Sequence, residues 1–279
     1  MAIAPAAFTG TPCPQRDHAS SPAPTREALT KAYVINLDRA ADRLAHMREV
    51  FDRLGVDFER VAATDGATLP AEVVEDFRRN RTAAKPDGWL PGEVGCFFGH
   101  FSAWLKVAAG EQDWAAVFED DIHAAPDLAK LLSSADWIPA DAEIVRLEGT
   151  GSTMRLAGGR PIRAVPGRKI YRAISGTAGA AGYVIARRVA ARLVEVAPEL
   201  HSIPDVFLFK PKMSPVARGL RRYQVVPAVC IQDEVLTRGE ARLRSQIKTR
   251  ITRGRGYRER SNPLLRLWPV QRIAVPYRA

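Results

Sequence analysis

The stretch Ala115-Ala116-Val117-Phe118-Glu119-Asp120-Asp121 joins a short apolar run to three consecutive acids. The apolar part has the length of a buried strand, and Pro126 opens a helical pattern soon after it. Open α/β sheets bind their ligands at the carboxyl ends of their strands. The stretch therefore predicts an α/β fold in which Glu119, Asp120 and Asp121 lie together at the edge of a sheet.

Three adjacent carboxylates repel one another, and a cation between them would keep them ionised. Hard oxygen ligands of this kind suit Mg²⁺ or Mn²⁺. The spacing alone is equally compatible with a solvated acidic turn, because such turns are common on protein surfaces.

Size and composition set the broad class. The chain has 279 residues, of which 46% are hydrophobic and 26% charged, so it is long enough for one large domain or two small ones. No apolar run approaches the roughly 20 residues that a membrane-spanning helix needs. Residues 1–30, rich in Ala, Pro, Ser and Thr, predict a disordered leader without the features of a secretory signal, and hence a cytoplasmic location.

The spacing of the cysteines and histidines argues against disulfide bonds and against metal sites built from these residues. The three cysteines lie far apart, and the five histidines show no H-x-H or H-E-x-x-H pattern. The sequence therefore supports neither a disulfide framework nor a zinc ribbon nor a histidine-rich metal site.

The net charge of +10 belongs to the end of the chain. Residues 237–279 hold 12 Arg and Lys against two Glu, which leaves residues 1–236 neutral overall. Their dense charge predicts a weakly ordered basic extension that follows a domain at 31–236. Within it, Leu264, Leu265, Leu267 and Trp268 form an apolar patch of the interfacial type, so we expect peripheral attachment to an anionic membrane surface. A tail that wraps the domain or stays solvated is an equally open alternative.

The first ordered part of the chain predicts a βαβ unit. Ala32–Leu37 reads as a buried strand, Asp38 as the cap of a helix that runs to Leu54, and Asp57–Ala63 as a second strand. Gly55 ends the helix, and the short crossover makes the two strands parallel. The residues that follow the first strand contain no G-x-G-x-x-G, which counts against a dinucleotide-binding dehydrogenase, and the chain contains no P-loop.

The remaining elements follow from the apolar pattern. His100 lies among the aromatic residues of a helix that begins at Pro91, where a satisfied core histidine is more common than a ligand. Asp205 is a lone acid in an apolar run, either a helix cap or a carboxylate facing a cleft. The glycine-rich stretch 175–185 permits either tight packing or close contact with a ligand. The other predicted elements are helices at 70–80, 126–134 and 187–196, strands at 142–147 and 223–231, and a hairpin or loop at 160–172.

Taken in order over residues 31–233, these pieces resemble glycosyltransferase family 25, which includes bacterial lipooligosaccharide galactosyltransferases and animal collagen galactosyltransferases. The matching stretches are Val34-Ile35-Asn36-Leu37-Asp38-Arg39 with Asp42-Arg43-Leu44, Ala63-Thr64-Asp65-Gly66, Gly92-Glu93-Val94-Gly95-Cys96 with His100 and Trp104, Glu119-Asp120-Asp121, Gly176-Thr177 through Gly182-Tyr183, and Asp205-Val206-Phe207-Leu208. In one place the chain departs from the family: Pro204 directly precedes Asp205, where the family usually shows Pro-x-Asp.

The resemblance implies a GT-A-like fold: a single catalytic domain whose Rossmann-related, mostly parallel sheet is flanked by helices. It implies transfer of a sugar, commonly galactose, from a UDP-sugar to a hydroxyl of a glycan or glycolipid acceptor, with inversion and with Mn²⁺ or Mg²⁺. By the match to the family's acidic motif, Asp121 would ligate the metal, and Glu119 would lie toward the metal or the ribose. The residues expected to contact the donor are Asn36, Leu37, Arg39, Arg43, Asp65, Glu119 and Asp120.

Inversion needs a base for the acceptor hydroxyl. Asp205 is the first candidate, with Glu148 and Asp233 behind it. Two other functions remain open at this point. A metal-dependent phosphoryl-transfer enzyme or nuclease would also use an acidic cluster, although the basic residues are not interleaved with the core motifs, so no nucleic-acid partner is expected. The other open function is that of a non-catalytic relative that binds a nucleotide sugar.

Overall fold

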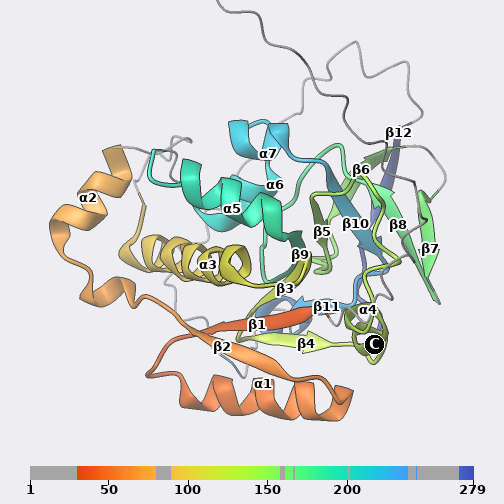
Figure 1. The fold of residues 1–279 in the computed structure, drawn as a ribbon, viewed down its shortest axis with the longest axis horizontal. Helices are drawn as coiled ribbons and strands as arrows, with labels where there is room; N and C mark the ends of the chain where they lie inside the picture. Colours follow the sequence, from red (N-terminus) through yellow and green to blue (C-terminus); the bar gives the residue numbers. More distant parts are fainter. Residues whose placement is uncertain are drawn as a thin grey trace, which may run out of the picture.

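A mixed β-sheet forms the centre of the molecule (Figure 1). The computed structural model describes residues 30–79, 89–157, 161–165, 167–199, 202–237, 243 and 270–279. In order across the sheet, its eight strands are β2 (Phe58–Ala62), β1 (Lys31–Asn36), β3 (Trp114–Glu119), β9 (Gly182–Ala186), β5 (Ile144–Arg146), β10 (Arg222–Val226), β8 (Arg168–Arg172) and β7 (Arg163–Val165).

Most of these strands run in one direction. β1 is parallel to both β2 and β3, and β5 is parallel to β10. β9, between β3 and β5, and β8, near the far edge, run against the others. The predicted α/β fold with a mostly parallel sheet is confirmed, and the parallel βαβ unit is confirmed by the register of Ile35 opposite Val61.

Helices cover both faces of the sheet and divide the core in two (Figure 1). α1 (Ala41–Leu54) and α4 (Asp127–Leu132) pack on one face, and α3 (Pro91–Ala109), α5 (Arg187–Val196) and α6 (Pro204–Phe209) on the other. Neighbouring residues of β3 alternate between the two cores, with Val117 in one and Phe118 in the other, as the pleat of a strand requires. The remaining helices among the described residues are η1 (Gly66–Thr68), a 3₁₀ turn, α2 (Ala71–Arg79), α7 (Pro215–Gly219) and α8 (Asp233–Leu236).

The first helix begins later than predicted. α1 starts at Ala41 rather than at Asp38, whose exposed carboxylate instead pairs with Arg60 of β2 at 2.5 Å. Gly55 ends the helix with φ of 63°, a left-handed conformation that glycine adopts without strain. The prediction of the cap was wrong because the chain first makes a turn, in which the N–H of Ala40 donates to the carbonyl oxygen of Leu37 at 2.9 Å.

The single strand predicted at 223–231 is divided. β10 ends at Val226, and a separate strand, β11 (Cys230–Gln232), pairs with β4 (Ile122–Ala124) in a small antiparallel sheet. Pro227 lies between the two strands and lacks the N–H group that would continue the ladder. The division carries Gln232 away from the main sheet and toward the acids that follow β3.

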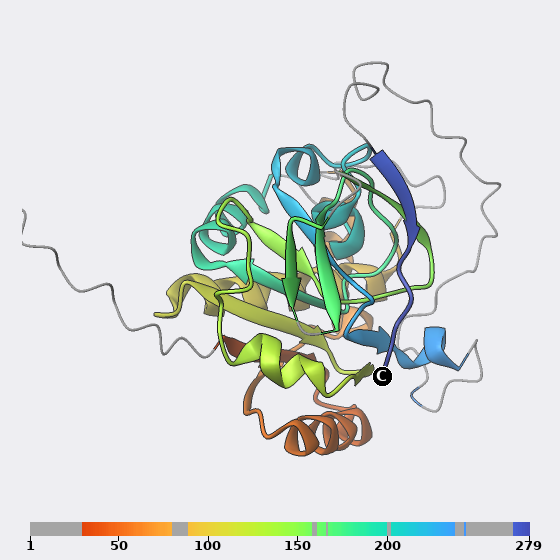
Figure 2. The same ribbon diagram turned by 90° about the vertical axis from the view of Figure 1, so that its right-hand side faces the viewer.

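The last ten residues pack on the domain. β12 (Val270–Ala274) pairs antiparallel with β6 (Thr153–Ala157), at the side of the sheet shown in Figure 2. Val275 is buried with Met154 and Leu156. The expected weakly ordered extension from 237 to 279 was therefore wrong for residues 270–279, whose apolar side chains cover the β6 edge. Leu264 to Trp268, and the leader up to residue 29, lie outside the described residues.

The hairpin predicted at 160–172 is confirmed as β7 and β8. Within the described residues, no helix has both the length and the apolar character needed to cross a bilayer.

Candidate active site

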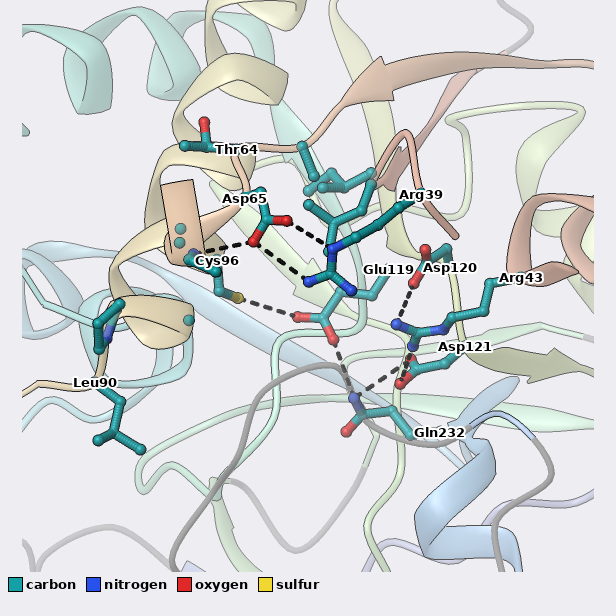
Figure 3. A pocket seen from close by; sticks show the side chains of 18 residues that line it. Arg39, Arg43, Thr64, Asp65, Leu90, Cys96, Glu119, Asp120, Asp121 and Gln232 are labelled. Atoms are coloured by element: carbon teal, nitrogen blue, oxygen red, sulfur yellow. Dashed lines mark hydrogen bonds and ion pairs between the residues drawn. The ribbon is translucent and has the colours of Figure 1, made fainter. Parts of the chain in front are cut away.

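A cavity of about 580 Å³ opens where β1 and β3 end (Figure 3). One wall is the acidic stretch after β3, a second is the segment after β1, and a third is the loop before η1 together with the beginning of α3. Of the residues predicted to contact the donor, six line this cavity: Leu37, Arg39, Arg43, Asp65, Glu119 and Asp120. Asp121, the predicted metal ligand, lines it too.

The acidic stretch is not a solvated turn. Asp120 and Asp121 are buried, and Arg43 of α1 reaches both of them, with Nη1 at 3.0 Å from Asp120 Oδ1 and Nη2 at 2.5 Å from Asp121 Oδ2. Asn36 donates to the other oxygen of Asp120 at 2.7 Å. Asn36 thus lies behind the cavity and orients a lining residue, and Arg43 supplies the positive charge that the two aspartates need.

Burial makes the acidic wall hard to keep ionised. Burial raises the pKa of Glu119 to about 8, and the Asp121 carboxylate adds to this effect while Arg43 opposes it. Burial raises the pKa of Asp120 to about 6, again opposed by Arg43. Burial therefore favours the neutral form of Glu119, and a cation bound beside it would favour the ionised form.

The carboxylates also converge on one point. The side-chain amide of Gln232 donates from Nε2 to Glu119 Oε2 at 3.0 Å and to Asp121 Oδ1 at 3.5 Å. One oxygen of Glu119 and one of Asp121 therefore face the same amide nitrogen, at one side of the cavity. The residues present therefore fit a hard divalent ion, with Gln232 able to turn its carbonyl oxygen toward it.

The opposite wall is built by close backbone packing. A side chain at Gly66 would collide with the carbonyl oxygen of Pro91 at 1.9 Å, and one at Gly95 with the carbonyl oxygen of Thr64 at 2.6 Å. These glycines let the first turn of α3 press against the turn that contains Asp65. Helix N-termini attract anions, so this wall suits a phosphate group.

An ion pair lies across the entrance. Arg39 Nε lies 2.6 Å from Asp65 Oδ2, and the other oxygen of Asp65 caps η1 by accepting from the N–H of Ala67 at 3.0 Å. Arg39 lowers the pKa of Asp65, and the hydrogen bond from Ala67 lowers it further. The Arg39 side chain is half exposed and can turn toward a ligand.

His100 is a core histidine, as predicted, and it supports the acidic wall from behind. Its Nε2 lies 3.2 Å from Glu119 Oε1, and its Nδ1 lies 2.9 Å from the Tyr183 hydroxyl. Burial lowers its pKa to about 3, so the ring is neutral. Cys96, one helical turn before His100, directs its sulfur at the same oxygen of Glu119 from 3.9 Å.

The three candidate bases differ in exposure. Glu148 is completely buried against Arg146 at 3.1 Å, and Asp233 is buried against His123 at 2.7 Å. Asp205, in the first turn of α6, keeps 14% of its side chain exposed and pairs with Lys210 at 3.0 Å. None of the three lines the cavity, but the charge of Asp205 contributes to the raised pKa of Glu119. Of the three carboxylates, Asp205 is the one that solvent reaches near the acidic wall.

Two residues that line the cavity, Cys96 and Gln232, were not predicted from the sequence to have a role in the site. Cys96 lay within a family-like stretch, and its position four residues before His100 was the signal that could have placed it beside Glu119. Gln232 had no such signal, because only the pairing of β11 with β4 carries it to the acids.

The chain is similar to known proteins over most of its length. The family described as glycosyltransferase family 25 (LPS biosynthesis protein) matches residues 29–208. The chain is 29% identical over 226 residues to the lipooligosaccharide biosynthesis protein lic2B of Haemophilus influenzae, covering 78% of this chain and 81% of that protein.

Two further proteins are similar to this chain. The lacto-N-neotetraose biosynthesis glycosyltransferase LgtB of Neisseria meningitidis is 30% identical, with 72% of this chain and 74% of that protein covered. Procollagen galactosyltransferase 1-A of Xenopus laevis is 26% identical, with 66% of this chain but only 31% of that protein covered.

Proposed function

Because the chain belongs to glycosyltransferase family 25, and is thus an enzyme that uses a nucleotide-sugar donor and a glycan acceptor, we propose that its donor is a UDP-hexose, with galactose as the first candidate. The acceptor is a hydroxyl group of a glycan or glycolipid such as lipooligosaccharide, and transfer inverts the anomeric centre. The observation that carries this proposal is the facing of two walls across one cavity: the carboxylates of Glu119 and Asp121, and the N-terminus of α3.

The acidic wall suits a cation, and the wall formed by the first turn of α3 suits the diphosphate of the donor. When UDP leaves, negative charge grows on its diphosphate, and groups already aimed at that charge lower the barrier. The first turn of α3 offers a positive dipole end, where the Glu93 carboxylate already accepts from the backbone N–H of Leu90 at 2.9 Å, and Arg39 offers a half-exposed guanidinium. Asp65, fixed by Arg39 and Ala67, keeps further acceptor capacity for a ribose or base N–H or O–H group.

A divalent ion, Mn²⁺ or Mg²⁺, belongs on the acidic wall. Asp121 Oδ1 and Glu119 Oε2 would hold it, since both already share the Gln232 amide, while Arg43 continues to neutralise Asp120. Such an ion supplies charge stabilisation to the departing diphosphate.

Asp205 is the proposed base. The side chain is partly exposed, with Oδ2 paired to Lys210 and Oδ1 buried without a hydrogen-bond partner among the described residues, and its negative charge raises the pKa of Glu119. Its Oδ2, once released from Lys210, would accept the proton of the acceptor hydroxyl.

We expect Asp205→Asn to lower turnover by about 10²–10⁴-fold, the usual contribution of a general base, while UDP affinity stays within a few-fold. Lys210→Met is the matched control, because it removes the ion pair and keeps the carboxylate. Turnover of the Asn variant close to that of the wild type would mean that Asp205 is structural.

A donor screen tests the function itself. Purified protein is incubated with Mn²⁺, one UDP-, GDP- or CMP-sugar at a time, and a set of lactose- or glucose-ended acceptors, and both free nucleotide and elongated acceptor are measured. We expect UDP release and acceptor elongation to rise together with UDP-galactose. Release with another nucleotide alone would refute the proposed donor.

The basic segment before β12 is proposed to attach the enzyme to an anionic membrane, where a lipid-linked acceptor would be met. Its support comes from the sequence, because residues 238–269 contain ten Arg and Lys against two Glu. Each Arg or Lys near an anionic leaflet contributes about 1 kcal/mol to the binding free energy. Since residues 270–279 complete the fold, charge reversal is a cleaner test than truncation. Replacing Arg250, Arg253, Arg255 and Arg258 by Glu should abolish co-sedimentation with phosphatidylglycerol vesicles and spare transfer to a soluble acceptor. Unchanged sedimentation would end this proposal.

A further inference from the structure

A column of fully buried polar side chains stands behind Glu119. Trp104 and His100 lie one turn apart on α3, and Tyr183 lies on β9, whose register places it opposite Val117 of β3. The Trp104 indole donates from Nε1 to the Tyr183 hydroxyl at 2.8 Å. The same hydroxyl lies 2.9 Å from His100 Nδ1, and His100 Nε2 lies 3.2 Å from Glu119 Oε1.

The donor and acceptor properties of these groups fix the direction of each hydrogen bond in the column. An indole N–H can only donate, so the Tyr183 oxygen is an acceptor toward Trp104. The hydroxyl proton of Tyr183 then needs an acceptor of its own, and among the described residues the group in reach is His100 Nδ1. Nδ1 must therefore lack a hydrogen, which places the ring hydrogen on Nε2, facing Glu119.

The two oxygens of Glu119 thus have different partners. Oε1 is engaged from behind by His100 and, more weakly, by the Cys96 thiol. Oε2 lies with Gln232, on the side that Asp121 shares. A carboxylate that is free to rotate could offer either oxygen, or both, to a cation.

We propose that His100 is a positioning residue that, as the last donor of a Trp104–Tyr183–His100 relay, holds Glu119 so that it presents Oε2 alone to the donor site. The inference rests on the proposed function, since it assigns Glu119 a role toward the metal–diphosphate group of the donor. It makes Glu119 a ligand of one oxygen, fixed before the donor arrives, and so lowers the cost of ordering that a mobile side chain would bring to binding.

The same atoms offer a rival arrangement. Cys96, His100 and Glu119 place three ligand atoms within 4.8 Å of one another, as a zinc site would. A metal on His100 Nε2 would move the ring hydrogen to Nδ1. The completely buried Tyr183 hydroxyl would then face two donors and have no acceptor for its own proton among the described residues. The relay satisfies every polar atom of the column, and the zinc site does not.

Two substitutions at His100 separate a positioning role from a structural one. The amide nitrogen of glutamine extends to about the place of Nε2, so His100→Gln keeps the donor to Glu119 and loses the acceptor for Tyr183. Asparagine extends only to about the place of Nδ1, so His100→Asn keeps the contact with Tyr183 and loses Glu119. The two variants therefore divide the two hydrogen bonds between them.

Positioning predicts opposite rankings for binding and stability. In UDP titrations at increasing Mn²⁺, the half-saturating Mn²⁺ concentration should rise about 10–100-fold in His100→Asn, the usual cost of losing such a supporting partner, and stay within a few-fold in His100→Gln. In thermal denaturation without ligand, His100→Asn should be the more stable of the two. If the variant with the lower melting temperature also has the higher half-saturating Mn²⁺ concentration, His100 is merely structural and the proposal is wrong.

The ring itself gives a readout that needs no donor. With histidine labelled by ¹⁵N, the signals that disappear in His100→Gln should show a protonated Nε2 and an unprotonated Nδ1, and added Zn²⁺ should leave them unchanged. A hydrogen on Nδ1, or stoichiometric Zn²⁺ binding that protects Cys96 from alkylation, would overturn the relay. If the wild type bound no UDP with Mn²⁺, the proposed function would fail and with it the role of Oε2, while the ring hydrogen would still decide the direction of the column.

Discussion

Two strands of the sheet lead to a glutamate at or just after their carboxyl ends, and the two glutamates differ in exposure. β3 ends at Glu119, and β5 is followed two residues later by Glu148, with β9 between the two strands. Glu119 is 22% exposed and lines the cavity, whereas Glu148 is completely buried. Both carboxylates are near the same edge, so position at a strand end does not by itself make an acid part of a site.

The loop above each end makes the difference. Glu148 Oε2 accepts from Arg146 at 3.1 Å and from the backbone N–H of Ala181 at 3.0 Å. Gly179 lies over the same carboxylate, with φ of 94°, and a side chain there would meet Glu148 Oε1 at 2.4 Å. The glycine-rich stretch before β9 therefore seals Glu148, and the reading of these glycines as packing residues holds at Gly179. No comparable loop covers Glu119 among the described residues.

The sealed end should respond to substitution with a loss of stability. Glu148→Leu leaves the buried Arg146 guanidinium without its carboxylate, which we expect to destabilise the protein by about 3–5 kcal/mol in urea denaturation. Glu148→Gln keeps the volume and an acceptor for Ala181 and should transfer sugar at nearly the wild-type rate. A Gln variant of normal stability but with turnover reduced 100-fold would show that Glu148 takes part in the reaction after all.

The open end should respond with a loss of activity. Asp121→Asn keeps the volume, and Arg43 keeps its pair with Asp120, so the fold should survive. Loss of one ligand charge from the acidic wall is expected to lower transfer by on the order of 10²–10³-fold, the scale of removing one group that stabilises developing charge. Circular dichroism and transfer rates at saturating Mn²⁺ check this expectation, and full activity would remove the metal site from the account.

The cover over Glu148 can be tested through its glycine. Gly179→Ala places a methyl group against Glu148 Oε1 in a left-handed backbone conformation. We expect a loss of roughly 1–3 kcal/mol in stability, the usual scale of such strain. Gly151→Ala, also at positive φ but with nothing within 4 Å, isolates the backbone part. Equal losses in the two variants would mean that contact with Glu148 adds nothing.

The smallest effect is expected at the cavity entrance. Arg39→Ala removes a half-exposed ion pair to Asp65, so stability should change by less than about 1 kcal/mol. UDP affinity should fall several-fold if Arg39 turns toward the diphosphate, and the loss should shrink at high salt. An unchanged affinity at low salt would restrict Arg39 to its partnership with Asp65.

Local pattern was enough to predict much of the fold and the acidic wall. The apolar run before Glu119 predicted β3, and the 3.6-residue spacing of α1 with Gly55 predicted the parallel βαβ unit. The resemblance to family 25 correctly gave the family and the fold class. Asp121 and six of the seven donor-contact candidates share one cavity, and their roles in it are proposed.

What local pattern could not supply depends on contacts between distant segments. Arg43 is an ordinary helix residue in sequence, and its burial between Asp120 and Asp121 follows from the packing of α1 under the end of β3. Gln232 reaches Glu119 because β11 leaves the main sheet to pair with β4. The sealing of Glu148 depends on the backbone conformation of Gly179, and the position of β12 on the pairing of residues more than 100 positions apart.

The central claim is that the cavity beside β3 binds a nucleoside diphosphate together with a divalent ion on Glu119 and Asp121. The direct measurement is the melting temperature of the full chain with UDP, with Mn²⁺, with both, and with single-stranded DNA as the ligand expected of a nuclease. At 100 times the dissociation constant, a bound ligand stabilises the fold by about 2.7 kcal/mol. The account predicts a rise with UDP and Mn²⁺ together that exceeds the sum of the separate effects and is lost in Asp121→Asn. Stabilisation by UDP that is independent of Mn²⁺ and of Asp121, or stabilisation by DNA in place of UDP, would contradict it.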